Sequence, residues 1–401
     1  MVLIGIVGKT NVGKSTLFKA LTLAEVEISN RIFTTINPNH GIGFVRTKCP
    51  EDKAGSKCNP NIGYCVDGWR FVPVELLDVA GLVPDAHKGK GLGLKFLDDL
   101  RQADVFIHVI DVSGSTNEHG EPVKPNSYDP ANDIKFLEEE IGYWFLSLLK
   151  KNWAKFSREV EMMKKDLVDS LLKQFSGLKI TEGQIKKALE ATDLPKDKPS
   201  QWSDDDLKNF AFELRGLSKK MIIAANKIDI EGAEKNLERL RKEFPDYTII
   251  PCSAESELAL KEASKHGLIK YIPGNSSFEI LQPEELSERQ RRGLEIIRER
   301  VLDRFGSTGV QDVINKAMFD VLRYIIVYPV ANINKLTDKK GRVLPDALLV
   351  PKGTRLKEFA AKIHSDMAEK FIGGIDFETK RKLGADYEVK NGDIIEILFG
   401  K

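Results

Sequence analysis

The segment GKTNVGKS, residues 8–15, places two glycines, a lysine and a serine at a spacing that suits one kind of chemistry. It fits the pattern G-x-x-x-x-G-K-[ST], in which successive backbone N–H groups at the positive end of a helix dipole cradle phosphate groups. In such a loop Lys14 would reach the β- and γ-phosphates, and the Ser15 hydroxyl would ligate Mg²⁺. A plain glycine turn between a strand and a helix is the alternative, and the complete spacing argues against it.

Two further segments carry groups that would surround the same phosphates. The motif DVAG follows an apolar run, which places the Asp78 carboxylate to hold the Mg²⁺ shell and the Gly81 N–H to contact the γ-phosphate. The segment FTTINPN, residues 33–39, lies between the two motifs, and one of its threonines would supply a hydroxyl to Mg²⁺ and an N–H to the γ-phosphate. We expect Thr35 rather than Thr34 in this role, with an ordinary loop as the alternative.

The sequence NKID, residues 226–229, contains groups that would select the base. The Asp229 carboxylate can accept hydrogen bonds from N1–H and from the 2-amino group of guanine, whereas adenine offers neither donor on that edge. Asn226 can bridge to the N7 side of the base and tie down the phosphate loop, and the Lys227 stem can pack on the ring. The loop CSA, residues 252–254, would contact guanine O6 through its backbone. The candidate contacts with GTP or GDP are therefore Gly8, Asn11, Val12, Gly13, Lys14, Ser15, Thr16, Asn226, Lys227, Asp229, Ser253 and Ala254, and those with Mg²⁺ are Ser15, Thr35 and Asp78.

These motifs lie at the ends of apolar runs that indicate buried strands of the parallel type. Residues 129–218 interrupt the alternation of strands and helices with long helical periodicity. The alternation predicts an α/β fold with a doubly wound, mostly parallel sheet, whose ligand lies at the carboxyl ends of the strands. We expect strands at 2–7, 71–77, 105–112, 221–225 and 247–251, with a helix directly after the phosphate loop.

The pattern changes again from about residue 325. Short strands, one helix at roughly 354–364 and a turn at 390–393 precede a closing strand, IIEILF. Asn391-Gly392 between strand-like runs predicts a β-hairpin. We therefore expect three parts: a P-loop nucleotide-binding domain at 1–128 and 219–324, a helical insert at 129–218, and a small α+β domain at 325–401.

Composition argues against several other classes of protein. The 401 residues carry a net charge of +1 and are 41% hydrophobic, which favours a folded globular chain and gives no electrostatic case for nucleic-acid or membrane binding. No run approaches the ~18 apolar residues of a membrane span, and we expect no signal peptide. The four cysteines lack the spacing of a secreted disulfide framework, so we expect a cytoplasmic protein.

Three of the cysteines, Cys49, Cys58 and Cys65, lie between the threonine segment and Asp78. Tetrahedral zinc usually takes four ligands, some of them at C-x₂₋₄-C spacing. Here the gaps are longer, and His40 is the candidate for a fourth ligand. A hairpin elaboration with reduced thiols is therefore the favoured interpretation, with a zinc site as the alternative.

Taken together, the motifs resemble the Obg family of GTPases. FTTINPNHG after the phosphate loop, and DVAGLVPDAHKGKGLGLKFLDDLRQAD, resemble the YchF or Obg-like ATPase branch of that family in an archaeal form. RVLPDALLVPKGTRLKEFAAKIHSD, followed by YEVKNGDIIEILF, resembles a TGS domain, which is a ubiquitin-like β-grasp module. The resemblance implies a coiled-coil-like helical insert and contact with the ribosome, tRNA or rRNA.

One departure from that branch bears on the choice of base. Its bacterial and eukaryotic members typically carry an altered motif with Glu in place of Asp and prefer ATP, whereas this chain keeps NKID with Asp229. We therefore expect GTP as the ligand, with an ATPase like the bacterial relatives as an alternative.

The residue after DVAG bears on hydrolysis. Leu82 stands where Ras-like GTPases place the glutamine that orients the attacking water. An asparagine at the loop position of Asn11 is found in GTPases that bind K⁺ against the phosphates. We therefore expect slow basal hydrolysis that K⁺ or a partner increases. The alternative is that Asn11 only stabilises the loop. The expected catalytic residues are Lys14, Thr35, Gly81 and Asn11. The predicted function is a GTP-hydrolysing switch associated with the ribosome, and the alternative is a nucleotide-gated binding or stress-regulatory module with incidental hydrolysis.

Overall fold

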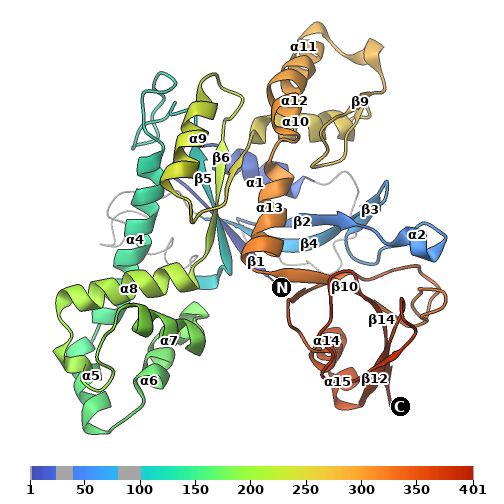
Figure 1. Cartoon of the computed structure of the whole chain (residues 1–401). Coiled ribbons are helices and arrows are strands. Elements are labelled where there is room, and N and C mark those ends of the chain that lie inside the picture. The colour runs from blue at the N-terminus through green and yellow to red at the C-terminus, as the bar shows by residue number, and fades with distance from the viewer. Residues whose placement is uncertain (1, 24–38, 80–100, 401) are drawn as a thin grey trace.

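A seven-stranded sheet forms the centre of the molecule (Figure 1). In the computed structural model, which describes residues 2–23, 39–79 and 101–400, its strands lie in the order β2-β4-β1-β5-β6-β7, and β3 pairs with β4. Strands β4, β1, β5, β6 and β7 are parallel, as the apolar runs predicted, whereas β2 and β3 run antiparallel to β4. The strands span Leu3–Val7 (β1), His40–Lys48 (β2), Tyr64–Val66 (β3), Trp69–Asp78 (β4), Val105–Asp111 (β5), Met221–Asn226 (β6) and Ile249–Pro251 (β7).

Alternating side chains of the central strands face two different helical layers, because successive side chains of a strand point to opposite faces. Ile4 and Ile6 of β1 share a core with α1, α10 and α13. Leu3 and Val7 share a second core with α4 and α8 on the other face, and α9 packs beside them against β6. These helices span Lys14–Thr22 (α1), Ala131–Lys150 (α4), Asp204–Ser218 (α8), Ala233–Glu243 (α9), Ala254–Lys265 (α10) and Val310–Lys316 (α13).

The predicted helical insert is more compact than a long two-helix hairpin. Helices α4 and α8 pack against each other, and between them the chain forms α5 (Trp153–Met162), α6 (Leu167–Gln174) and α7 (Glu182–Ala191). Trp144 and Phe145 of α4 are buried. Trp153 and Trp202 stack with ring centroids 5.1 Å apart. These rings share one buried core with side chains of α6 and α7, such as Leu171 and Ile185, so the extra helices close around them.

A helical region leads from the sheet to the C-terminal lobe. The small hairpin of β8 (Ile269–Lys270) and β9 (Glu279–Ile280) is followed by α11 (Glu288–Ile297) and α12 (Asp303–Phe305). Two π-helical turns, Arg298–Leu302 and Ala317–Val321, lie beside α12 and α13.

The C-terminal lobe is a mixed α+β unit, as the sequence predicted, but its five-stranded sheet carries two helices where one was expected. Its strands lie in the order β11-β10-β14-β12-β13, and β14 is parallel to β10 but antiparallel to β12. The predicted helix is α14, which packs on β12. The elements span Tyr324–Val330 (β10), Leu348–Pro351 (β11), Leu356–Ile363 (α14), Ser365–Glu369 (α15), Phe371–Asp376 (β12), Lys382–Leu383 (β13) and Ile394–Phe399 (β14).

The hairpin predicted around Asn391-Gly392 is wrong. A turn is present there, with Gly392 at a φ of 86°, but β13 pairs with β12 rather than with β14. The Asn391 side chain instead accepts a hydrogen bond from the Ile326 backbone N–H (2.9 Å), and the Gly392 N–H donates to the Ile326 carbonyl (2.7 Å). The turn therefore docks on β10 and sends β14 into the middle of the sheet.

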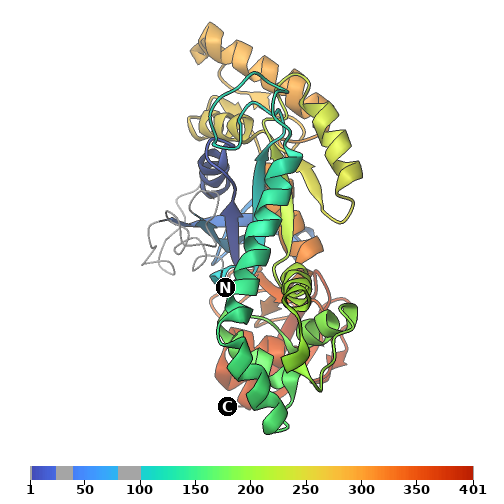
Figure 2. The ribbon, with the colours of Figure 1, turned by 90° about the vertical axis from the view of Figure 1, so that its left-hand side faces the viewer.

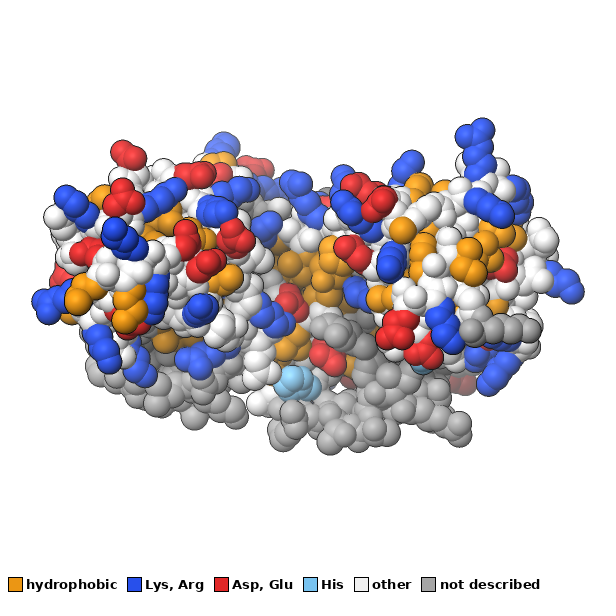
Figure 3. All heavy atoms as spheres, turned by 90° about the horizontal axis from the view of Figure 1, so that it is seen from below, with side chains coloured by type: hydrophobic (Ala, Val, Ile, Leu, Met, Phe, Trp, Pro, Cys, Tyr) orange, Lys and Arg blue, Asp and Glu red, His pale blue; other side chains and the backbone are white. Residues whose placement is uncertain are grey.

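The insert and the C-terminal lobe lie at the same end of the molecule. In Figure 2, β1 rises from the N-terminus towards α1, and both lobes lie together beyond the other end of the sheet, away from α1. Lys and Arg side chains alternate with Asp and Glu side chains over both lobes (Figure 3), in line with the balanced charge of the chain.

Candidate nucleotide-binding site

The described parts of the predicted motifs meet at one edge of the sheet because the strands that carry them are parallel. Strand register places Ile6 of β1 beside Asp78, the last residue of β4, and Asp111 of β5 beside Asn226 of β6. The phosphate loop follows β1 directly, and the loop at Cys252 follows β7. Segments more than 200 residues apart in the sequence thus form a single edge.

The glycines of the phosphate loop are required by close approach of other groups. Gly8 has a φ of 155°, and a Cβ there would lie 2.5 Å from the Val109 carbonyl oxygen. Gly13 has a φ of 92°, and a Cβ there would lie 2.2 Å from Asn226 Nδ2. Gly13 is also the N-cap of α1 and supplies no side-chain hydrogen bond to the helix. The first N–H groups of α1 therefore remain open to an anion.

Lys14 and Asp78 are already in contact across the loop. Lys14 Nζ lies 2.6 Å from Asp78 Oδ1, and both side chains are only partly exposed. Ser15, the second residue of α1, is exposed beside them. The ammonium predicted to hold phosphates and two of the groups predicted to hold Mg²⁺ thus share one location.

Asn226 links three segments of the site. Its Nδ2 donates to the Val12 carbonyl (2.8 Å), and its Oδ1 accepts from the Ala254 backbone N–H (3.0 Å). This is the predicted tie between Asn226 and the phosphate loop, extended to the loop after β7. Ser253 caps α10 by accepting from the Ser256 N–H. Contact of Asn226 with a base stays a prediction.

Asp229 stands free at the position predicted to read the base. Its side chain is half-buried, and within the described part of the chain it has neither a hydrogen-bond nor an ion-pair partner. A partly desolvated carboxylate without donors is the arrangement that gains most from the two N–H donors of guanine.

A buried carboxylate that the sequence analysis missed fixes the neighbouring lysine. Asp111 is 1% exposed, accepts from the hydroxyls of Ser115 (2.8 Å) and Thr116 (3.0 Å), and forms an ion pair with Lys227 Nζ at 2.8 Å. Burial alone would raise the pKa of Asp111, but the Lys227 ammonium and the hydroxyl donors outweigh it and lower that pKa. The pair holds the Lys227 stem beside the base position. The available signal was a carboxylate ending the apolar run VFIHVID.

The segment after β5 braces the phosphate loop from outside. Asn11 Nδ2 donates to the Gly120 carbonyl (2.8 Å), and Thr10 Oγ1 donates to the His119 carbonyl (3.2 Å). Lys9, only 7% exposed, pairs with Asp133 Oδ1 at 2.9 Å. The first lysine of the motif is therefore structural, and Lys14 is the one that faces the phosphate position.

Three predicted residues lie outside the described part of the chain. They are Thr35, Gly81 and Leu82, which belong to the segments 24–38 and 80–100. Their roles stay predictions.

Comparison with known proteins agrees with this geometry. The model of a 50S ribosome-binding GTPase matches residues 3–140, that of the G4 motif-containing domain of an Obg-like GTPase matches 224–332, and that of a TGS domain matches 335–399. An uncharacterized GTP-binding protein of Methanocaldococcus jannaschii is 52% identical over 398 residues, which is 99% of each chain. This chain belongs to the Obg-like (YchF) family of GTP-binding proteins.

Other members of the Obg-like family extend the comparison to the whole chain. The crystal structure of a GTP-binding protein from Pyrococcus horikoshii matches with a TM-score of 0.79 at 38% identity and covers 100% of both chains. A ribosome-binding ATPase YchF of Escherichia coli O157:H7 is 28% identical over 418 residues, 98% of each chain. The family assignment supports a guanine nucleotide as the ligand of this edge. Among the described helices, none is long and apolar enough to cross a membrane.

Proposed function

We propose that the protein hydrolyses GTP to GDP and phosphate, and that it acts as a switch on the ribosome. The observation that carries the proposal is the convergence of Lys14, Asp78 and the free Asp229 on one edge, with Asn226 and Lys227 held between them. These groups cover both ends of a nucleotide: phosphate at Lys14 and base at Asp229.

Binding of a nucleotide would exchange the partners of Lys14. In the structure the Lys14 ammonium neutralises Asp78. Phosphate oxygens would take over the ammonium, and Asp78 would then face a Mg²⁺ shell together with Ser15 and Thr35. Mg²⁺ would supply positive charge to the β- and γ-phosphate oxygens. The residues fit that ion, because carboxylate and hydroxyl oxygens are the ligands it prefers.

Hydrolysis requires water to attack the γ-phosphorus while the bond to the β-phosphate oxygen breaks. Lys14 and the loop N–H groups would stabilise the charge that moves onto the β-phosphate. Leu82 offers no hydrogen bond to orient the water, so basal turnover is expected to be slow.

The first prediction concerns K⁺. Asn11 Nδ2 is engaged with Gly120, and Oδ1 has no described partner, so Oδ1 is available to a monovalent cation. Replacing Na⁺ with K⁺ should raise GTP turnover at least about tenfold, because a cation at this position supplies charge as an arginine finger does. Asn11→Ala should lose that increase and keep its rate in Na⁺ within about threefold. Equal turnover of the unmodified protein in the two salts would contradict a role for K⁺ and leave Asn11 as a brace.

The second prediction separates a switch from a passive module. Phosphate release should rise at least about tenfold when ribosomes are added, because a docked partner can complete an incomplete hydrolysis site. Lys14→Met, assayed with the same ribosomes, controls for contaminating GTPases. Nucleotide-dependent co-sedimentation with ribosomes, without any change in turnover, would instead support the nucleotide-gated binding module.

A further inference from the structure

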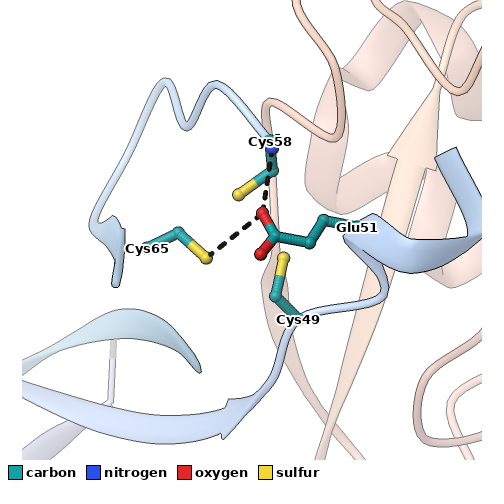
Figure 4. Close-up of side chains that lie close together, drawn as sticks. All are labelled: Cys49, Glu51, Cys58 and Cys65. Atoms are coloured by element: carbon teal, nitrogen blue, oxygen red, sulfur yellow. Dashed lines mark hydrogen bonds between the residues drawn. The ribbon is translucent and has the colours of Figure 1, made fainter. Parts of the chain in front are cut away.

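Three thiols and a carboxylate converge at the junction between the central sheet and the C-terminal lobe. Cys49 follows β2, Glu51 begins α2 (Glu51–Ala54), and Cys65 lies in β3. The three Sγ atoms and one Glu51 carboxylate oxygen all lie within 4.8 Å of one another, and none of the cysteines is in a disulfide (Figure 4). The remaining member, Cys58, lies in the loop between α2 and β3.

The spacing of these four atoms suits one tetrahedral ion. A Zn²⁺–thiolate distance of about 2.3 Å places tetrahedral sulfur atoms about 3.8 Å apart, so shifts on the order of 1 Å would close the site. The Cys58 N–H donates to Glu51 Oε2 at 3.1 Å, and Cys65 Sγ lies 4.0 Å from the same oxygen. A carboxylate directed at two thiols would repel their thiolate forms unless a cation lay between them. A surface cleft lined by Cys49, Glu51 and Trp69 offers the ion an entry path.

We propose that Cys49, Glu51, Cys58 and Cys65 bind one Zn²⁺ in a closed structural site. Three soft thiolates with one carboxylate favour Zn²⁺ over Mg²⁺ or Ca²⁺. The sequence favoured reduced thiols and offered His40 as a fourth ligand for the zinc alternative; Glu51 takes that place instead, because His40 begins β2 and Cys49 follows its other end. Sequence spacing did not point to Glu51, which is only two residues after Cys49. Its carboxylate lies beside the Cys49 thiol only because the chain turns between β2 and α2.

The neighbourhood of the cluster shows what the ion would hold. Arg70 is fully buried, and its Nη1 lies 4.0 Å from Cys58 Sγ. The same guanidinium donates to the carbonyls of Leu344 (3.1 Å) and Pro345 (2.9 Å). Arg70 would thus compensate the surplus negative charge of the zinc ligands, as outer groups of metal sites do, while it anchors the chain before β11.

The loop that carries Cys58 makes the same connection through its backbone. The Asn59 N–H donates to the Val343 carbonyl (2.8 Å), and the Asn61 N–H donates to the Pro345 carbonyl (2.7 Å). Zinc bound to Cys58 would fix this loop and therefore fix how the C-terminal lobe sits on the sheet. The site is far from the nucleotide edge, because β4 separates Trp69 from Asp78 by about 30 Å of strand. The zinc proposal does not depend on the proposed GTP hydrolysis.

Metal analysis of the full-length protein, expressed with zinc and purified without chelator, tests the proposal. One zinc per chain is expected, and Cys58→Ser and Cys65→Ser should each reduce it to about one tenth or less. Cys252→Ala, which removes the cysteine outside the cluster, should keep one zinc. Glu51→Gln should weaken zinc at least about tenfold in competition with a chelator, whereas Asp52→Asn, one residue along α2 and exposed, should not.

The unmodified protein provides a test that does not depend on the folding of variants. Cobalt added after zinc removal should give thiolate-to-metal absorption and tetrahedral bands with one equivalent. Zinc removal should speed amide hydrogen exchange of residues 55–63 at least about tenfold and leave β5 unchanged. Absence of both zinc and the cobalt spectrum, stoichiometric iron in place of zinc, or unchanged zinc in Cys58→Ser and Cys65→Ser would overturn the proposal.

Discussion

Lys14→Met is expected to lower the rate of GTP hydrolysis by about 100- to 1,000-fold, because it removes a preorganised charge from the transferring phosphoryl group. The same change should weaken GTP binding, because Lys14 lies at the open N-terminus of α1, where the phosphates are expected. Within the described part of the chain, no other cation contacts Asp78 and could replace the lost charge. Single-turnover phosphate release with saturating enzyme measures the loss in the chemical step.

The Lys14→Met protein should remain folded. Met retains the unbranched stem of Lys14, and Asp78, whose side chain is 20% exposed, keeps a route to solvent once its partner is removed. Lys19→Met is the matched control, because Lys19 is exposed on the same helix and should leave turnover unchanged. Full hydrolysis by Lys14→Met would contradict the assignment of the phosphate loop.

Asp229→Asn is expected to convert the preference of the site from guanine to xanthine. The substitution removes the carboxylate and with it two charge-assisted hydrogen bonds to guanine, each worth about 1.5–3 kcal/mol. GTP affinity should therefore fall on the order of 100- to 10,000-fold. Xanthine carries a carbonyl where guanine carries its 2-amino group, and the new amide can donate to it. Competitive titration with GTP, XTP and ATP measures the change.

Asp246→Asn provides the control for this change. Asp246 is exposed in the loop before β7, away from the edge, so its substitution should leave all three affinities unchanged. Unaltered GTP affinity in Asp229→Asn would show that Asp229 does not contact the base.

Local patterns were sufficient to predict which groups the fold brings together at this edge of the sheet. The buried parallel strands are nearly continuous apolar runs, and each motif at a strand end is a short uninterrupted stretch of sequence. The members of the edge, from Gly8 to Ala254, could therefore be predicted from the sequence. The turn at Asn391-Gly392 shows the limit of such patterns. Its residues predicted the turn, but the partner of β14 was decided by docking on Ile326, 65 residues away.

The contacts missed in the sequence depend on how the chain folds back on itself. Asp111 is recognisable only once Lys227, 116 residues later, is placed against it. The brace of Asn11 on Gly120 spans 109 residues. Glu51 resembles any surface carboxylate until β2, α2 and β3 bring it to three thiols. Such partners are set by the fold rather than by local spacing.

The central claim is that this edge of the sheet binds and hydrolyses GTP in preference to ATP. The most direct test is kcat/KM of the purified protein for each nucleotide, measured by phosphate release in one buffer with Mg²⁺ and K⁺. The account predicts a value for GTP at least about 100-fold higher, since the unpaired Asp229 finds two donors on guanine and none on the same edge of adenine. An equal or higher value for ATP would contradict it.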